Sequence, residues 1–79
     1  GSGSLSIVSN PCRGTLGFIL PDAAWSCGLV DMSGRRVRTA VSPGGMCAVD
    51  LDGLPPGVYF FEAVSADVEY SQKVVILGD

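Results

Sequence analysis

Residues 25–41 read WSCGLVDMSGRRVRTAV and predict a β-hairpin. An alternating apolar run precedes the segment Asp31–Gly34, and a second strand-like run follows it. Asp at the first corner and Gly at the fourth are preferred in a type I turn closed by a residue in the left-handed region, which gives a hairpin with a glycine bulge. Asp31 can accept N–H bonds from the turn, and Gly34 has no Cβ to oppose a positive φ. Such turns recur in proteins of unrelated function, so the turn alone assigns none.

The size and composition of the chain restrict what it can be. Its 79 residues suffice for one domain with one core. Apolar residues make up 47% of the chain and charged residues 16%, so we expect an ordered domain rather than a disordered one. The formal net charge of −3 argues against nucleic acid or an anionic membrane as a partner. Arg35, Arg36 and Arg38 nevertheless make the hairpin tip basic.

Alternation and turn signals run through the whole chain, and no long stretch has a helical period, so we expect strands only. The expected strands are Leu5–Val8, Thr15–Leu20, Trp25–Val30, Arg35–Val41, Met46–Leu51, Val58–Val64 and Val68–Leu77. Seven short strands at this spacing are typical of a small antiparallel β-sandwich of immunoglobulin-like architecture. The expected core residues, chosen by strand parity, are Phe18, Trp25, Leu29, Val49, Tyr59 and Phe61.

The remaining patterns refine this organisation. Residues 1–4, Gly-Ser-Gly-Ser, are interpreted as a cloning remnant or flexible linker, and residues 5–79 as a single β-sandwich domain. Val58–Val64 is nearly apolar on both faces, as expected of a central strand, whereas the last strand carries Lys73 and is expected at a sheet edge. Pro56-Gly57 predicts a type II turn with a positive φ at the glycine. The longest apolar runs are far too short to span a bilayer, so no transmembrane segment is expected.

Three cysteines, Cys12, Cys27 and Cys47, leave two interpretations open. Cys27 and Cys47 both have inward strand parity, and a disulfide between them would contribute about 3 kcal/mol on the chain-entropy model. The alternative is three buried thiols, because free cysteine is itself among the most buried residue types. The chain has no CxxC pair and no histidine, so a zinc site would lack ligands.

No arrangement of residues predicts catalysis. Without histidine the usual general base and triad partner are missing. Asp50 and Asp52 share a strand face, but calcium needs six to eight oxygen ligands and no loop concentrates them. Gly44-Gly45 is followed by neither the residues nor the helix of a phosphate-binding loop. The sequence therefore predicts a domain that is not an enzyme and that uses no metal and no cofactor.

Four segments of the chain, in this order, resemble one family. They are Asn10-Pro11 with Gly14 and Leu16-x-Phe18-x-Leu20-Pro21, then Leu29-Val30-Asp31-Met32-Ser33-Gly34-Arg35-x-Val37, then Leu51-x-Gly53-Leu54-Pro55-x-Gly57-Val58-Tyr59-Phe60, and finally Gln72-Lys73-Val74-Val75-Ile76. Together they span residues 7–77. The chain resembles the type A C-terminal sorting domain of the type IX, or Por, secretion system. Cys12 after Asn10-Pro11 departs from the family pattern, and so does the presence of three cysteines.

The resemblance implies a role in protein export. Such domains follow a cargo domain, fold in the periplasm and are recognised by the outer-membrane translocon and its shuttle proteins. A sortase-like peptidase then removes the domain just upstream of its first strands, and the cargo reaches the cell surface or the medium. The family motifs carry over to candidate recognition residues at Gly34, Arg35, Gly57, Tyr59, Lys73, Val74 and Val75. An edge strand beside a basic loop would suit recognition by strand addition. The glycines and Tyr59 have an equally good structural interpretation.

Other interpretations of the same patterns stay open at this point. Leu54-Pro55-Pro56-Gly57-x-Tyr59 is also similar to immunoglobulin-like or prealbumin-like sandwiches that serve as adhesion or stalk modules. The strand and Gly-x-Tyr patterns are similar to the flagellar hook-capping scaffold domain as well. An exposed last edge could also pair two copies of the chain in an edge-strand dimer.

Overall fold

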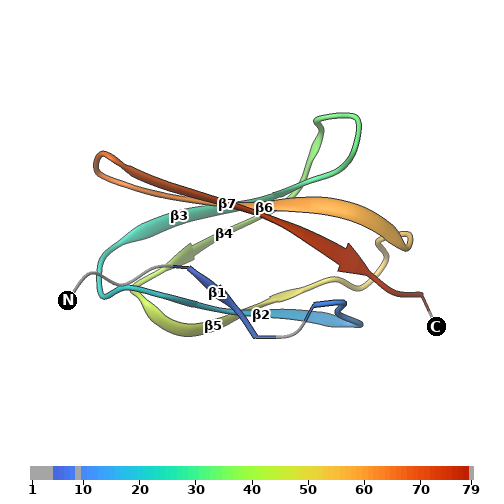
Figure 1. Ribbon diagram of the computed structural model, residues 1–79, viewed down its shortest axis with the longest axis horizontal. Helices are drawn as coiled ribbons and strands as arrows, with labels where there is room; N and C mark the ends of the chain where they lie inside the picture. Colours follow the sequence, from blue (N-terminus) through green and yellow to red (C-terminus); the bar gives the residue numbers. More distant parts are fainter. Residues whose placement is uncertain (1–4, 9, 79) are drawn as a thin grey trace.

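A computed structural model describes residues 5–8 and 10–78 and shows two antiparallel sheets packed face to face (Figure 1). The strands are β1 (Ser6–Ile7), β2 (Thr15–Leu20), β3 (Trp25–Val30), β4 (Arg36–Ser42), β5 (Gly45–Asp50), β6 (Gly57–Ser65) and β7 (Val68–Ile76). One sheet has the order β1-β2-β5, and the other has the order β4-β3-β6-β7. The predicted seven-stranded antiparallel β-sandwich is confirmed. The predicted linker at residues 1–4 lies outside the described residues.

The strand boundaries follow the sequence patterns closely. β2 and β3 coincide with their predicted ranges, and β7 ends one residue early. β1 is shorter than the predicted Leu5–Val8, although the Val8 N–H still donates to the Gly17 carbonyl at 2.9 Å. β6 lies between β3 and β7, and β7 is an edge strand, as their compositions predicted.

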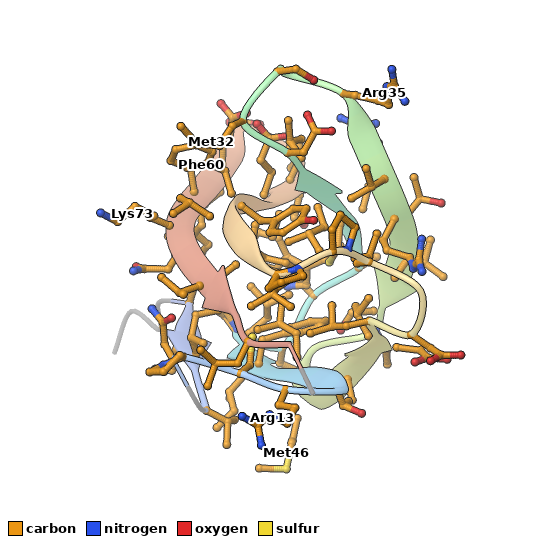
Figure 2. All side chains as sticks on the ribbon, turned by 90° about the vertical axis from the view of Figure 1, so that its right-hand side faces the viewer. Arg13, Met32, Arg35, Met46, Phe60 and Lys73 are labelled. Atoms are coloured by element: carbon orange, nitrogen blue, oxygen red, sulfur yellow. The ribbon has the colours of Figure 1, made fainter. Side chains whose placement is uncertain are left out.

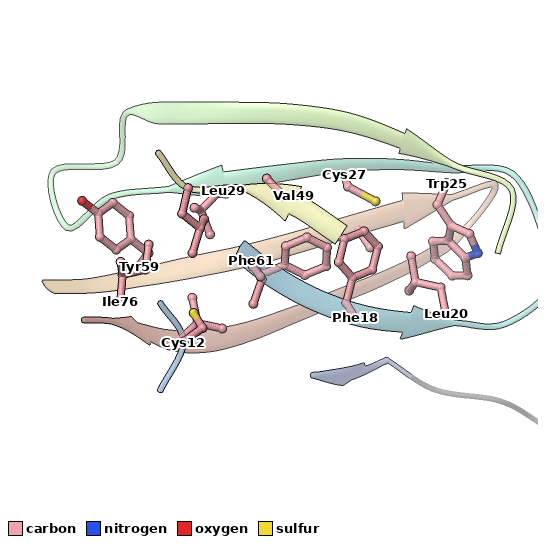
Figure 3. Close-up of a cluster of buried hydrophobic side chains, with 14 residues drawn as sticks. Cys12, Phe18, Leu20, Trp25, Cys27, Leu29, Val49, Tyr59, Phe61 and Ile76 are labelled. Atoms are coloured by element: carbon pink, nitrogen blue, oxygen red, sulfur yellow. The ribbon is translucent and has the colours of Figure 1, made fainter. Parts of the chain in front are cut away.

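The core forms where the inward-facing side chains of the two sheets meet (Figure 3). The six predicted core residues are all buried. Phe18 of β2 and Phe61 of β6 bring their ring centroids to 4.6 Å across the sandwich. Trp25 stacks on Tyr70 with centroids 5.4 Å apart and donates its indole N–H to the Pro21 carbonyl at 2.8 Å. Burial of these aromatic rings supplies much of the driving force for a domain of this size.

The two sheets are joined along both sides. On one side the Arg38 guanidinium of β4 donates to the carbonyls of Asp50 at 3.1 Å and Asp52 at 2.5 Å, just where β5 ends. On the other side, residues 10–12 lie along β7 and bond to its backbone. None of the described residues, 5–8 and 10–78, belongs to a helix able to cross a membrane.

Candidate functional site

The turn between β3 and β4 has the geometry that its sequence predicts. The Gly34 N–H donates to the Asp31 carbonyl at 3.0 Å, and Gly34 has a φ of +89°. The Asp31 Oδ1 accepts the Ser33 hydroxyl at 2.7 Å, the Ser33 N–H at 2.9 Å and the Arg35 N–H at 3.0 Å. The register shifts between Leu29 and Val30, which is the expected bulge. Asp31 therefore holds the turn together through one carboxylate oxygen.

The turn should respond to acid through this carboxylate. Hydrogen bonds from the Ser33 side chain and then from the Arg35 backbone lower the pKa of Asp31 below its ordinary value. A lowered folded-state pKa gives stability that is present above the unfolded value of about 3.9 and is lost as the pH falls through the folded value. We expect wild type to resist urea better than Asp31→Asn at neutral pH, and this advantage to disappear at about pH 2. An advantage that persists in acid would contradict this role, and Asp22→Asn controls for the change in net charge.

The second motif turn, around Pro55–Gly57, differs from its prediction. Gly57 has a φ of +155°, far from the value near +80° of a type II turn, because it already pairs with Ile76 as the first residue of β6. Tyr59 is buried and donates its hydroxyl to the Pro55 carbonyl at 2.7 Å. Gly57 and Tyr59 therefore shape this turn from inside the fold.

The two motif turns lie next to each other. A shallow pocket between them is lined by Met32 and Ser33 from the first turn and by Pro55, Pro56 and Val58 from the second. Segments that are more than twenty residues apart in the sequence thus form one surface at this end of the four-stranded sheet.

The three candidate residues of the last strand differ in accessibility. Val74 is 0% exposed and faces the core. Lys73 is exposed and pairs with Phe60, whereas Val75 is half-buried and pairs with Val58. Because side chains alternate along a strand, Lys73 and Val75 lie on the outer face of the sheet, and a partner can reach them there.

The outer face near the motif turns carries exposed apolar side chains around Lys73. We define the outer patch as Met32, Val58, Phe60, Lys73 and Val75. Phe60 pairs with Val30 on one side and with Lys73 on the other. Met32 is 70% exposed and lines the pocket with Val58, Phe60 is 36% exposed, and Figure 2 shows Met32, Phe60 and Lys73 on the same side of the molecule. Their exposure makes them accessible to a partner.

The sequence-based candidates do not include three members of the outer patch, Met32, Val58 and Phe60, and they include Arg35, which lies away from it. Phe60 has outward parity in a strand that is nearly apolar on both faces, a pattern that predicts a central strand as well as an exposed aromatic side chain. Met32 occupies a turn position, where an apolar side chain has no structural requirement. Arg35 lies near β4, at the opposite edge of the four-stranded sheet from β7, so the structure does not bring it to Lys73 (Figure 2).

The cysteines are free thiols in the structure. Burial raises the pKa of Cys12, and burial together with a charge at Cys47 raises that of Cys27. The Cys47 thiol lies 3.0 Å from the Ser42 hydroxyl. Cys27 and Cys47 come from opposite sheets, on β3 and β5, and a disulfide between them in an oxidising compartment stays a prediction.

The described part of the chain, residues 5–8 and 10–78, holds no group of three Cys, Asp or Glu side chains arranged to bind a metal ion. Asp50 instead accepts the Asp52 N–H at 2.9 Å with its carboxylate, which closes the turn after β5.

Comparison with known proteins places the chain in one family. A family model described as "Secretion system C-terminal sorting domain" matches residues 6–77, which is nearly the whole chain. No curated protein matches the chain.

Proposed function

This chain belongs to the family of secretion system C-terminal sorting domains of the type IX, or Por, system, and we propose that the outer patch is the surface by which that system recognises it. Membership of this family implies the general role of the chain: a C-terminal sorting domain directs the export of the protein to which it belongs. The proposal concerns which residues are recognised.

The observation that supports the outer patch is its exposed apolar area around a single cation. Interaction surfaces are marked by accessible apolar and aromatic side chains with a few charged neighbours. Lys73 is the charged member of the outer patch, on a domain whose formal net charge is −3. The patch also contains residues from three of the four family motifs, which the fold brings together.

The seven candidate residues take different parts in this proposal. Lys73 and Val75 contact the machinery directly. Gly34 and Gly57 shape the two turns, and Tyr59 and Val74 support the patch from the core. Arg35 provides a separate basic contact at the far side of the sheet.

The proposed sequence of events follows the family. The domain travels with its upstream cargo into the periplasm and is bound there by the translocon and its shuttle proteins. A sortase-like peptidase cleaves upstream of β1 after export, and the cargo is left on the cell surface or in the medium.

The test is an export assay with matched variants. Residues 6–79 are fused to the C-terminus of a fluorescent protein with a signal peptide, in a bacterium with a working type IX system. Met32→Glu and Lys73→Glu are expected to lower export at least about tenfold, because each places a charge of the wrong kind in the patch; that factor corresponds to about 1.4 kcal/mol of lost binding.

The opposite face of the sandwich supplies the controls. Met46 is 71% exposed and Arg13 is exposed, and both lie on the three-stranded side, away from Lys73 (Figure 2). Met46→Glu and Arg13→Glu should be exported like wild type. If all four folded variants are exported equally, the outer patch is not the recognition surface. If the intact fusion stays in the periplasm of a competent host, the sorting function itself fails for this chain.

A further inference from the structure

The edge of β7 offers backbone groups in a regular order. In an antiparallel pair, every second residue directs both its N–H and its C=O away from its neighbour. Val75 directs both groups away from β6, because its N–H donates to the Asn10 side chain and its C=O accepts from Cys12. The same alternation places the N–H and C=O groups of Ser71 and Glu69 at the outer edge of the sheet.

A short segment covers one half of this edge. We define the strap as Asn10–Cys12. The Asn10 Oδ1 accepts the Val75 N–H at 3.0 Å, and its Nδ2 donates to the Lys73 carbonyl at 3.2 Å, so one side-chain amide replaces a strand residue. The Cys12 backbone adds bonds of 2.9 Å to the Val75 carbonyl and 2.8 Å from the Leu77 N–H.

The strap is anchored in the domain and stops at Lys73. Cys12 is buried in the core cluster, which fixes the strap against the sheet. Among the described residues, 5–8 and 10–78, none hydrogen-bonds to the outward backbone groups of Glu69 and Ser71. A strand edge with unpaired backbone groups is a template for pairing with another strand unless it is covered, so the described strap protects only the Lys73–Val75 part of this edge.

The open part of the edge is complementary to itself. Glu69 pairs with Val64, Ser71 with Glu62 and Lys73 with Phe60, so these three side chains follow one another on the outer face of the sheet. If two copies of β7 pair antiparallel about Ser71, Glu69 of each copy stands opposite Lys73 of the other. Opposite charges directly across an antiparallel pair are favourable, and a two-fold axis repeats the contact.

We propose that Glu69–Lys73 of β7 is a strand-pairing surface for a second copy of this chain, and that the strap limits this pairing by holding the Lys73 carbonyl. The occupant is a second copy because Glu69 and Lys73 match in charge when β7 pairs with itself. β4 carries Arg36 and Arg38 without an acidic residue, and β5 carries Asp50 without a basic one, so neither of these edges is complementary to itself in charge.

The strap and a second copy compete for the same atom. Pairing Glu69 of one copy with Lys73 of the other uses the Lys73 carbonyl, to which Asn10 now donates. Pairing also places a carboxylate against the Lys73 side chain. The strap thus favours a monomer in which Lys73 is free. This inference does not depend on the proposed function of the outer patch.

The test is sedimentation equilibrium of the full 79-residue chain under reducing conditions. Wild type is expected to dimerise weakly, with a Kd on the order of 100 µM to 1 mM, as suits an interface well below standard size. Glu69→Lys and Lys73→Glu should each weaken the dimer about tenfold or more, because two attractive pairs become repulsive. The double variant Glu69→Lys/Lys73→Glu should restore the wild-type Kd. Asn10→Ala should tighten it several-fold.

Each outcome decides the proposal. Asp22→Lys changes the net charge as Glu69→Lys does but lies away from β7, so it should dimerise like wild type. A wild type that stays monomeric to the solubility limit, a double variant that is not rescued, or an Asn10→Ala variant that associates no better would each overturn the proposal. The export assay separates the strand-pairing proposal from the proposed recognition by the outer patch. The double variant restores pairing but leaves Glu at position 73. It should therefore dimerise and still fail to be exported.

Discussion

Gly44→Ala is expected to destabilise the domain by about 3–5 kcal/mol, whereas Gly45→Ala should cost only about 1–2 kcal/mol. Both glycines have positive φ, +96° at Gly44 and +79° at Gly45, so both alanines suffer the strain of the left-handed region. Only at Gly44 would the added Cβ come too close to other atoms. A Cβ built there would lie 2.5 Å from the Pro21 carbonyl oxygen and 2.8 Å from the Asp22 Cα, whereas nothing lies within 4 Å of one at Gly45.

The large loss of stability expected for Gly44→Ala follows from the kind of atoms that the added Cβ would contact. The neighbours of Gly44 are backbone atoms of the β2–β3 connection, which cannot rotate away as the end of a side chain could. The Gly44 N–H also donates to the Ser42 hydroxyl at 3.0 Å, so the loop is held from its other side. A domain of 79 residues has only marginal stability, and a loss of this size would leave much of it unfolded.

The comparison is made by urea denaturation of both variants and wild type under the same conditions. Equal losses for the two glycines would mean that the β2–β3 connection moves aside, and the packing argument would then be wrong. A large loss at Gly44 alone would show that the two connections support each other where the sheets meet.

The sequence was informative where a local rule decides the structure. Strand parity identified the core residues, because a period of two is fixed by the backbone of a strand. Asp31 and Gly34 identified the first turn, since the turn type requires those residue types at those positions. Lys73 marked an edge strand, and β7 lies at an edge.

The sequence was uninformative where distant segments meet. Asn10 reads only as a turn residue, and its pairing with the backbone of β7 spans more than sixty residues. The contact surface that Met32 forms with Pro56 and Val58 depends on β3 pairing with β6, a choice that no single strand specifies. Gly57 was assigned to a turn because Pro-Gly favours one, but pairing with β7 extended the strand through it. In each case a tertiary contact outweighed or supplemented the local preference.

Phe60 and Phe61 provide the second large prediction, because two adjacent phenylalanines have opposite roles. Phe61 is 1% exposed and packs on Phe18 across the sandwich, whereas Phe60 points outward beside Lys73. Phe61→Ala should destabilise the domain by about 3–5 kcal/mol, the usual cost of removing a buried aromatic side chain. Phe60→Ala should cost about 1 kcal/mol, since much of its ring is already in contact with water.

Export and stability should therefore separate in these two variants. Phe61→Ala is expected to lose export because little folded domain is left to recognise. Phe60→Ala should stay folded at the growth temperature, with a far-UV spectrum like that of wild type, and yet be exported several-fold less efficiently. Measuring urea unfolding and export on the same pair of fusions gives both quantities. Normal export of Phe60→Ala would show that the Phe60 ring is not part of the recognition surface. Efficient export of an unfolded Phe61→Ala would mean that the type IX system recognises the sequence of this domain rather than its folded surface.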